Sequence, residues 1–314
     1  MNAPLIIGSG LVCLDAVLDP EGGEPFLHAG GTSLNVLCHL HRQGWRTRQL
    51  GTLGRDAAAR DLLNDLQIIG LPAGHIVQRD DIETPIYVER LGPDGHRFLR
   101  KCPYCGHAFA TYRSPDAETA SRWLASLPGD VDFVMLERAD AFSCQLAHAA
   151  TQQGARIYLE LNRVDDPQAF HQLVAMTDVF KYSQDRCGHF EPLADRERAP
   201  LEIETQGREG LRFRLANRTE TTDWQFIAAP PCASFVDGAG AGDAFSAAFL
   251  QGWAQHNREW LRHCNAQALH PLLQQAQAAA AQNCRYLSPR GGMYSPAQRQ
   301  RGGFCCTETA SMRQ

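Results

Sequence analysis

Strand-like and helix-like segments alternate along most of this 314-residue chain, and that alternation limits the folds it can adopt. Runs such as Leu5–Gly8, Val131–Leu136 and Arg156–Leu161 are typical of buried strands. Between them lie segments with apolar residues at helical spacing, such as Ala141–Gln152 and Pro167–Met176. This order predicts an α/β fold with a mostly parallel sheet and helices on both faces. Ligands of such sheets bind at the carboxyl ends of the strands, so the loops that follow strands are the candidate sites.

Three segments depart from the alternation. Residues 17–29 are rich in turn formers, and residues 82–112 contain two strand-like runs joined by a Gly-Pro-Asp-Gly turn. Strands outside a βα alternation often cover the strand ends, so we expect these two segments to form a small β-sheet lid. Residues 296–314 are polar and predict a loosely held tail, which leaves one domain over residues 1–295.

The composition excludes several classes of partner. The chain is 44% hydrophobic and carries a net charge of −5, which suits a globular protein and argues against nucleic acid or an anionic membrane as partner. The N-terminus has no basic region, and no apolar stretch is long enough to span a bilayer. The eleven cysteines are scattered through apolar segments and are expected to be reduced thiols, so a cytoplasmic location is predicted.

A glycine-rich loop precedes a helical pattern late in the chain. Gly and Ala fill most of residues 237–242, and apolar residues recur at helical spacing from Asp243 onward. Free N–H groups in the first turn of a helix form an anion site, and the helix dipole reinforces it. The alternative is a connection whose glycines only allow the helix to pack closely on the sheet. The loop alone leaves both readings open.

Five motifs in order carry a resemblance to a known family. GAGAGDAF (238–245) resembles the C-terminal signature of the ribokinase-like (PfkB) carbohydrate kinases, and GGTSLNVLCHLHRQG (30–44) resembles their N-terminal signature. LGTLGRD (50–56), ETQGREG (204–210) and a first strand ending near Asp15 resemble further landmarks of the family. The resemblance implies a ribokinase-like, doubly wound sheet with a lid. It also implies ATP-dependent transfer of phosphate to a hydroxyl of a sugar or sugar derivative, with Mg²⁺.

The resemblance also implies roles for individual residues. Asp243 matches the catalytic base, and the anion hole matches Gly240, Ala241 and Gly242. The positions that bind the acceptor hydroxyls match Asp15, Gly31, Asn35 and Glu137. The nucleotide loop matches Thr205, Gly207 and Gly210. Structural alternatives remain open, because Asp15 could cap a loop, Glu137 could be a solvated strand-end acid, and residues 204–210 could be a simple turn.

One position departs from the family in its charge. The family carries Asn-x-x-Glu after the strand that matches DVFKY, and its acid helps to hold Mg²⁺; here the two places are Ser183 and Arg186. A guanidinium repels Mg²⁺, which takes oxygen ligands. Either the neighbouring Asp185 replaces the acid, or Arg186 binds phosphate oxygens directly, or catalysis is impaired. The residues that hold the metal therefore stay unassigned.

A second departure is KCPYCGHAF at 101–109, which has the form of a zinc knuckle. A structural zinc site needs four ligands, and beyond Cys102, Cys105 and His107 the chain offers only pairs without knuckle spacing, Cys187 with His189 and Cys305 with Cys306. We expect a cysteine-containing turn beside the lid and no bound zinc.

Two other functions compete with sugar phosphorylation. A nucleoside kinase of the same fold would need an aromatic stacking surface, for which Phe26, Tyr87 and Phe98 are candidates. The other alternative is a sugar-binding or regulatory protein that has lost catalysis. It is suggested by Arg186, which stands where the family has an acid that helps to hold Mg²⁺. Relatives often dimerise through the lid, so a homodimer is a further expectation. The identity of the acceptor does not follow from the sequence.

Overall fold

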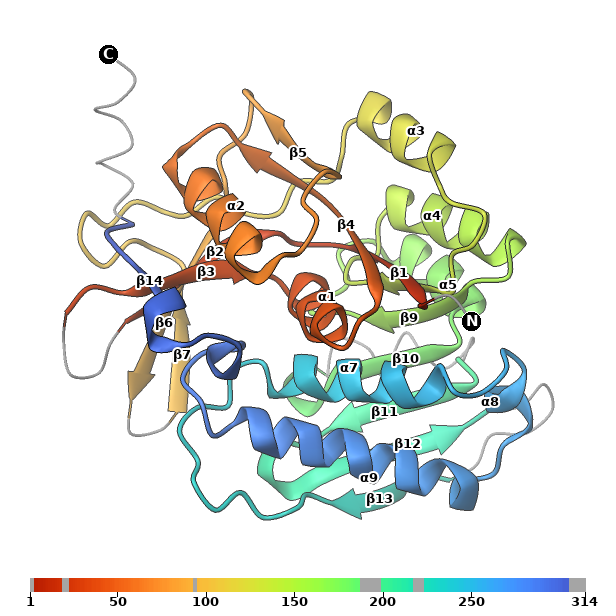
Figure 1. The fold of residues 1–314 in the computed structure, drawn as a ribbon. Coiled ribbons are helices and arrows are strands. Elements are labelled where there is room, and N and C mark those ends of the chain that lie inside the picture. The colour runs from red at the N-terminus through yellow and green to blue at the C-terminus, as the bar shows by residue number, and fades with distance from the viewer. Residues whose placement is uncertain (1–2, 19–22, 93–94, 187–198, 217–222, 305–314) are drawn as a thin grey trace.

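A nine-stranded sheet forms the centre of the molecule in the computed structural model, which describes residues 3–18, 23–92, 95–186, 199–216 and 223–304 (Figure 1). Its strands are, in spatial order, β13 (Gln225–Ala228), β12 (Gly210–Leu215), β11 (Leu201–Thr205), β10 (Val179–Ser183), β9 (Arg156–Glu160), β8 (Phe133–Leu136), β1 (Leu5–Ser9), β4 (Arg46–Gly54) and β5 (Ile76–Arg79). All neighbours from β5 to β11 run parallel, and β12 and β13 are antiparallel. The predicted α/β fold with a mostly parallel sheet is confirmed.

Helices cover both faces of this sheet (Figure 1). They are α1 (Thr32–Arg42), α2 (Ala57–Ile69), α3 (Ala117–Ala125), α4 (Ala141–Gln152), α5 (Pro167–Met176), α7 (Ala241–Trp253), α8 (Trp260–His263) and α9 (Ala266–Asn283). Alternate residues of β8 point to opposite faces: Phe133 and Met135 join the core with α1, α7 and α9, whereas Val134 and Leu136 join the core with α3, α4 and α5. Among the described residues, no helix is long and apolar enough to cross a membrane.

A second, smaller sheet lies beside the first and is seen at the left of Figure 1. Its strands are, in order, β14 (Gln300–Arg301), β3 (Phe26–Gly30), β2 (Cys13–Leu18), β6 (Ile86–Gly92) and β7 (Gly95–Leu99). Strand β2 pairs in parallel with β6, and the other neighbours are antiparallel. The predicted smaller sheet is thus present, and β3, β6 and β7 come largely from the two segments expected to form it.

The smaller sheet differs in detail from the sequence expectation. Strand β2 begins at Cys13, before the predicted segment 17–29, so Asp15 lies inside a strand and does not cap a loop. Strand β14 comes from the segment expected to be a loose tail, and Phe304 is buried there at 5% exposure. Pairing between segments so far apart, with Gln300 opposite Leu27, leaves no local pattern in the sequence. Residues 305–314 of that segment lie outside the described residues.

A buried ion pair holds the end of β3 against the helices. Asp65 of α2 and Arg290 are both fully buried, with 2.8 Å between Oδ2 and Nη2. The same Asp65 oxygen accepts hydrogen bonds from the Ala29 N–H at 2.9 Å and the Tyr294 hydroxyl at 3.1 Å. Arg290 also donates to the Ala29 carbonyl. This network fixes the backbone immediately before Gly30, where the first motif begins.

Candidate active site

The glycine loop is shaped by a buried acid that the sequence analysis did not single out. Asp237 accepts hydrogen bonds from the Ala239 N–H at 2.9 Å and from the Ser288 N–H at 2.8 Å. Gly240 has φ 70°, and a Cβ atom there would lie 2.4 Å from Pro289 Cα. Only glycine suits that conformation and that contact. The need for close packing, one of the two explanations of the glycine loop, therefore accounts for Gly240. It does not exclude the other explanation, that the loop binds an anion.

The first turn of α7 presents unused N–H groups. The Ala241 N–H donates to the Gly238 carbonyl at 3.2 Å, and the Ala244 N–H donates to the Gly240 carbonyl at 2.9 Å. Within the described parts of the chain, the N–H groups of Gly240, Gly242 and Asp243 meet no acceptor. With the positive end of the helix dipole, these three groups can bind an anion. Two of them belong to the predicted anion hole, and Asp243 adds its own N–H.

Asp243 lies in that first turn and is held from another helix. Its Oδ2 accepts a hydrogen bond from Asn35 Nδ2 of α1 at 2.8 Å, and the residue is 9% exposed. Burial, followed by the negative charge of Glu160, raises the pKa of Asp243 to about 7. The hydrogen bond from Asn35 and the charge of Lys181 act in the opposite direction. A carboxyl with this pKa can accept a proton near neutral pH.

Glu137 follows β8 and lies close to these groups. It is fully buried, its Oε2 accepts a hydrogen bond from the Ser33 N–H of α1 at 3.1 Å, and its Oε1 accepts one from Asn162 at 3.4 Å. Burial raises its pKa. The alternative of a solvated strand-end acid is therefore excluded.

Asp15 lies in the smaller sheet, directly above the glycine pair of the first motif. A Cβ at Gly30 would lie 2.1 Å from Asp15 Oδ2, and one at Gly31, which has φ 118°, would lie 1.9 Å from the Leu11 carbonyl oxygen. Both glycines are required by close approach. Burial raises the pKa of Asp15 to about 7, although the Cys13 thiol donates to its Oδ1 at 3.4 Å. Asp15 is thus a buried carboxyl in the central strand of the smaller sheet, packed against Gly30.

Several buried polar atoms around Glu137 have no hydrogen-bond partner within the described residues. They are Asn35 Oδ1, Asn162 Oδ1 and Arg138 Nε. Arg138 Nη2 lies 3.7 Å from Glu137 Oε1, and its guanidinium lies over the Tyr112 ring. Buried polar groups are nearly always paired, so two open acceptors and one open donor indicate a polar ligand. Asn162 and Arg138 were missed in the sequence, although each lies within two residues of a strand end.

The smaller sheet touches the glycine loop through a second acid. Glu89 of β6 is 1% exposed and hydrogen-bonded to Asp237. Burial, followed by the charge of Asp237, raises the pKa of Glu89 to about 9, so at neutral pH it is protonated and donates to Asp237.

Of the proposed stacking residues, Phe26 is buried against Tyr294 and offers no free face. Tyr87 and Phe98 form an edge-to-face pair with 6.3 Å between ring centroids.

The predicted nucleotide loop is the turn of the β11–β12 hairpin. Thr205 ends β11, Gly207 begins a single 3-10 turn, η2 (Gly207–Glu209), and Gly210 begins β12. A Cβ at Gly210 would lie 2.1 Å from the Ile227 carbonyl oxygen. Hairpin geometry therefore accounts for this glycine, and the nucleotide role of the loop rests on the motif. Thr205 lies at the carboxyl end of its strand, next to Ser183 of β10 in register.

The comparisons with known proteins identify the family. A sequence profile described as pfkB family carbohydrate kinase matches residues 10–294. The chain belongs to this family of carbohydrate kinases. Fructosamine kinase FrlD of Bacillus subtilis is 26% identical over 303 residues, which cover 92% of this chain and 95% of that protein. The family assignment confirms the resemblance seen in the motifs and the assignment as an enzyme, a phosphotransferase.

Solved structures agree with the ribokinase-like fold. A fructokinase with bound ATP from Xylella fastidiosa has a TM-score of 0.68 at 18% identity, covering 91% of this chain and 93% of that one. A nucleoside kinase from Burkholderia thailandensis in complex with inosine has a TM-score of 0.67 at 16% identity, covering 93% and 95%. At these identities the likeness shows the fold alone, and it is shared by kinases of both acceptor classes.

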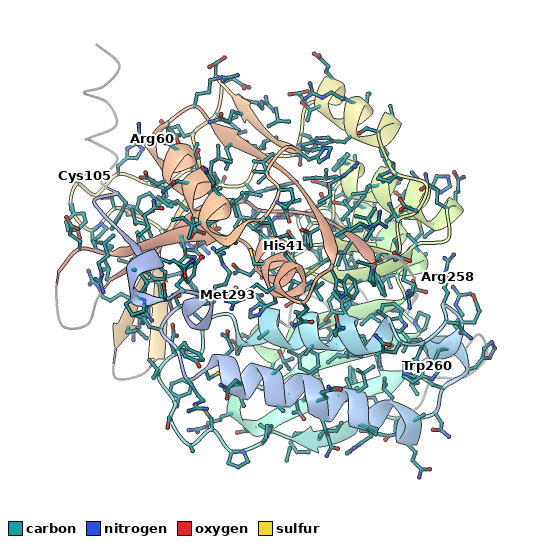
Figure 2. The ribbon with its side chains drawn as sticks, in the orientation of Figure 1. His41, Arg60, Cys105, Arg258, Trp260 and Met293 are labelled. Atoms are coloured by element: carbon teal, nitrogen blue, oxygen red, sulfur yellow. The ribbon has the colours of Figure 1, made fainter. Side chains whose placement is uncertain are left out.

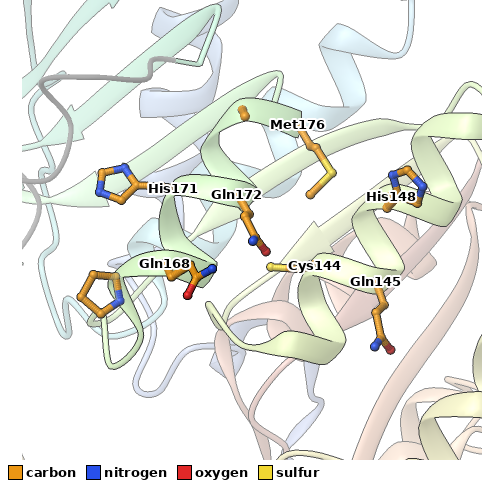
Figure 3. A pocket seen from close by; sticks show the side chains of 9 residues that line it. Cys144, Gln145, His148, Gln168, His171, Gln172 and Met176 are labelled. Carbon is orange, nitrogen blue, oxygen red and sulfur yellow. The ribbon is translucent and has the colours of Figure 1, made fainter.

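Two other features of this pfkB kinase lie apart from the site. An open groove between α4 and α5 (Figure 3) contains none of the predicted site residues and is lined by Cys144, Gln145, His148, Pro167, Gln168, His171, Gln172, Ala175 and Met176. Cys105 is exposed at the margin of the molecule near the smaller sheet (Figure 2), whereas Cys102 is buried. The described residues contain no group of three metal-ligating side chains. The other proposed zinc ligands, Cys187, His189, Cys305 and Cys306, lie outside the described residues, so the absence of zinc stays a prediction.

Proposed function

We propose that this pfkB kinase transfers the γ-phosphate of ATP to a hydroxyl of a sugar or sugar derivative, with Asp243 as the base. The observation that carries the proposal is the first turn of α7. There a buried carboxyl with a pKa of about 7 lies beside N–H groups that meet no acceptor among the described residues. A proton acceptor next to an anion site is what transfer of a phosphoryl group to an alcohol requires.

In the proposed reaction, Asp15, Asn35 and Glu137 bind hydroxyls of the acceptor. Their carboxylate and amide groups accept and donate the hydrogen bonds that a polyol offers. The oxygen of one acceptor hydroxyl forms a bond to the γ-phosphorus while the bond from that phosphorus to the bridging oxygen breaks, which releases ADP. Asp243 takes the hydroxyl proton late in the step, and the N–H groups of Gly242 and Asp243 stabilise the charge on the transferring group.

The nucleotide side of the proposal rests on residues 204–210 and on Asp185. Thr205, Gly207 and Gly210 are proposed to line the ATP site, because they match the family loop and follow a strand at the same sheet edge. Mg²⁺ usually binds one or two carboxylates together with phosphate oxygens and waters. Asp185 is exposed in the 3-10 turn η1 (Gln184–Arg186) after β10, so its carboxylate fits as the group that would hold Mg²⁺. Bound there, Mg²⁺ would neutralise phosphate charge. The side chain of Arg186 lies outside the part of the chain that the structure describes, so its proposed contact with phosphate stays a prediction.

A nucleoside acceptor is the second candidate, supported by one observation. Tyr87 is the neighbour of Asp15 in register, and its ring meets Phe98, which is 48% exposed. An aromatic pair beside the acceptor carboxyl could stack on a base. The three polar atoms near Glu137 that lack a partner among the described residues fit acceptor hydroxyls, which a sugar and the ribose of a nucleoside both carry, so the acceptor panel decides between the two.

The test is ATP turnover with a panel of hexoses, pentoses, amino-linked sugars, polyols and nucleosides at saturating Mg²⁺. We expect ADP release above the acceptor-free rate with at least one sugar, and a phosphorylated sugar as the product in mass spectrometry. Turnover with nucleosides alone would replace the proposal by its second candidate. Sugar binding by calorimetry without turnover on any acceptor would refute the kinase activity and support the regulatory alternative.

A further inference from the structure

Two opposite charges are buried behind the first turn of α7. Lys181, in the middle of β10, and Glu160, the last residue of β9, are 1% and 5% exposed. Lys181 Nζ forms an ion pair with Glu160 Oε1 and donates a hydrogen bond to the Gly242 carbonyl oxygen at 3.2 Å. Because Gly242 immediately precedes Asp243, the ammonium group contacts the backbone that carries the proposed base.

Glu160 holds the same helix one turn later. Its Oε2 accepts a hydrogen bond from Ser246 Oγ at 2.7 Å, and the Tyr158 hydroxyl donates to Ser246 Oγ at 2.9 Å. Ser246 Oγ also lies 2.9 Å from the Gly242 carbonyl oxygen. Side chains of β9 and β10 thus hold residues 242 and 246 of α7 through a connected set of hydrogen bonds. Such connected networks fix one geometry when every member is satisfied.

Gly242 and Lys181 fit each other closely. A Cβ at Gly242 would lie 3.2 Å from Lys181 Nζ and 3.7 Å from Glu160 Oε1. A Cβ at this position would force the ammonium group to shift by a few tenths of an ångström. This glycine therefore has a second reason to be in the loop, besides leaving its N–H group open to an anion.

A buried ion pair is a costly way to hold a helix. Desolvation of two charges offsets most of their attraction, and apolar residues of similar volume are often at least as stabilising. Lys181 Nζ lies 5.7 Å from the centre of the buried Phe245 ring of α7, so the pair has an apolar side chain beside it on the same face. Charges that are kept there, in contact with the turn that carries Asp243, indicate a role in the reaction.

We propose that Lys181 and Glu160 are positioning residues for phosphoryl transfer: together they fix the first turn of α7 and keep the charge beside Asp243 balanced. The inference deepens the proposed function and rests on Asp243 acting as the base. In this role neither residue touches the substrates. Lys181 acts through the Gly242 carbonyl, and Glu160 acts through Lys181 and Ser246.

Charge balance gives the two residues opposite effects on Asp243. The titratable and charged groups that face Asp243 are Cys38 of α1, Glu137 after β8, Tyr158 and Glu160 of β9, and Lys181 of β10. Glu160 raises the pKa of Asp243 and Lys181 lowers it. Since Asp243 must be ionised to take the proton, removal of Lys181 moves the acidic limb of the kcat profile to higher pH. Removal of Glu160 moves it to lower pH.

The experiment compares kcat against pH for the wild type, Lys181→Met, Glu160→Gln and the double variant, with the best acceptor of the panel. We expect the limb to move up by about 1 pH unit in Lys181→Met, down by a similar amount in Glu160→Gln, and to return near the wild-type position in the double variant. The matched control is Glu202→Gln, which breaks an ion pair with Arg214 on β11 and β12 at 1% exposure of the glutamate. It is expected to lower stability and leave the limb in place.

Ser246→Ala tests positioning without a change of charge. It removes the contact between Glu160 and α7, so kcat should fall about tenfold while the limb stays in place. The double variant and Ser246→Ala also serve if a single charge variant does not fold. Two results would overturn the inference while leaving the proposed function intact. The first is that Lys181→Met and Glu160→Gln fold and the acidic limb of their kcat profiles does not move. The second is that the double variant and Ser246→Ala both keep the kcat of the wild type. If the wild type shows no turnover, or Asp243→Asn is fully active, the proposed function fails and the inference fails with it.

Discussion

Replacing Asp65 by asparagine removes the carboxylate that forms an ion pair with the Arg290 guanidinium. Among the described residues, it is the only acidic side chain that does so. Asp65 and Arg290 are both fully buried, so no water reaches the charge that remains. Asparagine has nearly the same shape and retains one oxygen for the Ala29 N–H and the Tyr294 hydroxyl. The change therefore isolates the loss of negative charge from a loss of packing.

The expected cost follows from that burial. Removing one partner of a buried ion pair costs about 3–5 kcal/mol, because the remaining charge is left in a low-dielectric interior. The retained hydrogen bonds place Asp65→Asn at the lower end, about 3 kcal/mol. For 314 residues, an unfolding entropy of about 2.1 cal/mol/K per residue converts this into a fall in Tm of about 5 °C.

Urea denaturation followed by fluorescence measures the free energy of unfolding, and calorimetry measures Tm. The matched control is Asp165→Asn, which breaks a solvent-exposed ion pair with Arg163 and should cost less than about 1 kcal/mol. A double variant, Asp65→Asn with Arg290→Met, keeps the oxygen for the Ala29 N–H and the Tyr294 hydroxyl. It should cost less than Asp65→Asn alone, because no charge is then left unpaired. If Asp65→Asn cost no more than Asp165→Asn, the reasoning about this buried pair would be refuted.

Three further predictions concern the loop and the base. With the pKa of Asp243 raised to about 7, the ionised fraction and hence kcat should fall about tenfold from pH 8 to pH 6; a rate of ADP release that stays constant over that range would contradict the assignment. Asn35→Ala removes a hydrogen bond that lowers the pKa of Asp243, so the acidic limb should move to higher pH and kcat should drop about tenfold; an unmoved limb would show that the bond does not act on the base. Gly240→Ala places a Cβ 2.4 Å from Pro289 Cα at φ 70° and should cost about 1–3 kcal/mol in urea denaturation; the control, Gly74→Ala, meets no atom within 4 Å and should be neutral, so equal costs would count against the packing of the loop.

The sequence predicts the α/β core well because each element carries its own local pattern. The helices Ala141–Gln152 and Pro167–Met176 begin and end at the predicted residues, since Asp140 and Asp166 cap them and apolar residues recur at helical spacing. Strand β8 is a continuous apolar run, FVML, which the sequence marks as a buried strand. The hydrogen bond between Asn35 and Asp243, two motif residues more than two hundred positions apart, agrees with the order of the motifs.

What the sequence does not reveal depends on contacts between distant segments. Lys181 is the one charged residue of β10, and Glu160 is the last residue of β9. Only their meeting at α7 distinguishes them from solvated strand residues. The pairing of β14 with β3 likewise depends on residues far apart in the chain. The local signal in the sequence is a charged residue within an apolar, strand-like run, because charged residues are rarely buried unless they are paired.

The central claim is that Asp243 is the base of a phosphoryl-transfer site, and the kcat of Asp243→Asn tests it most directly. Asparagine can still accept the hydrogen bond from Asn35 at the position where the two side chains now lie 2.8 Å apart, so the fold and the loop should be preserved. ATP binding by calorimetry serves as the check that the site remains intact. We predict unchanged ATP affinity and a kcat lowered by about 10²–10⁴-fold with the best acceptor. A kcat within a few-fold of the wild type, with ATP still bound, would contradict the claim.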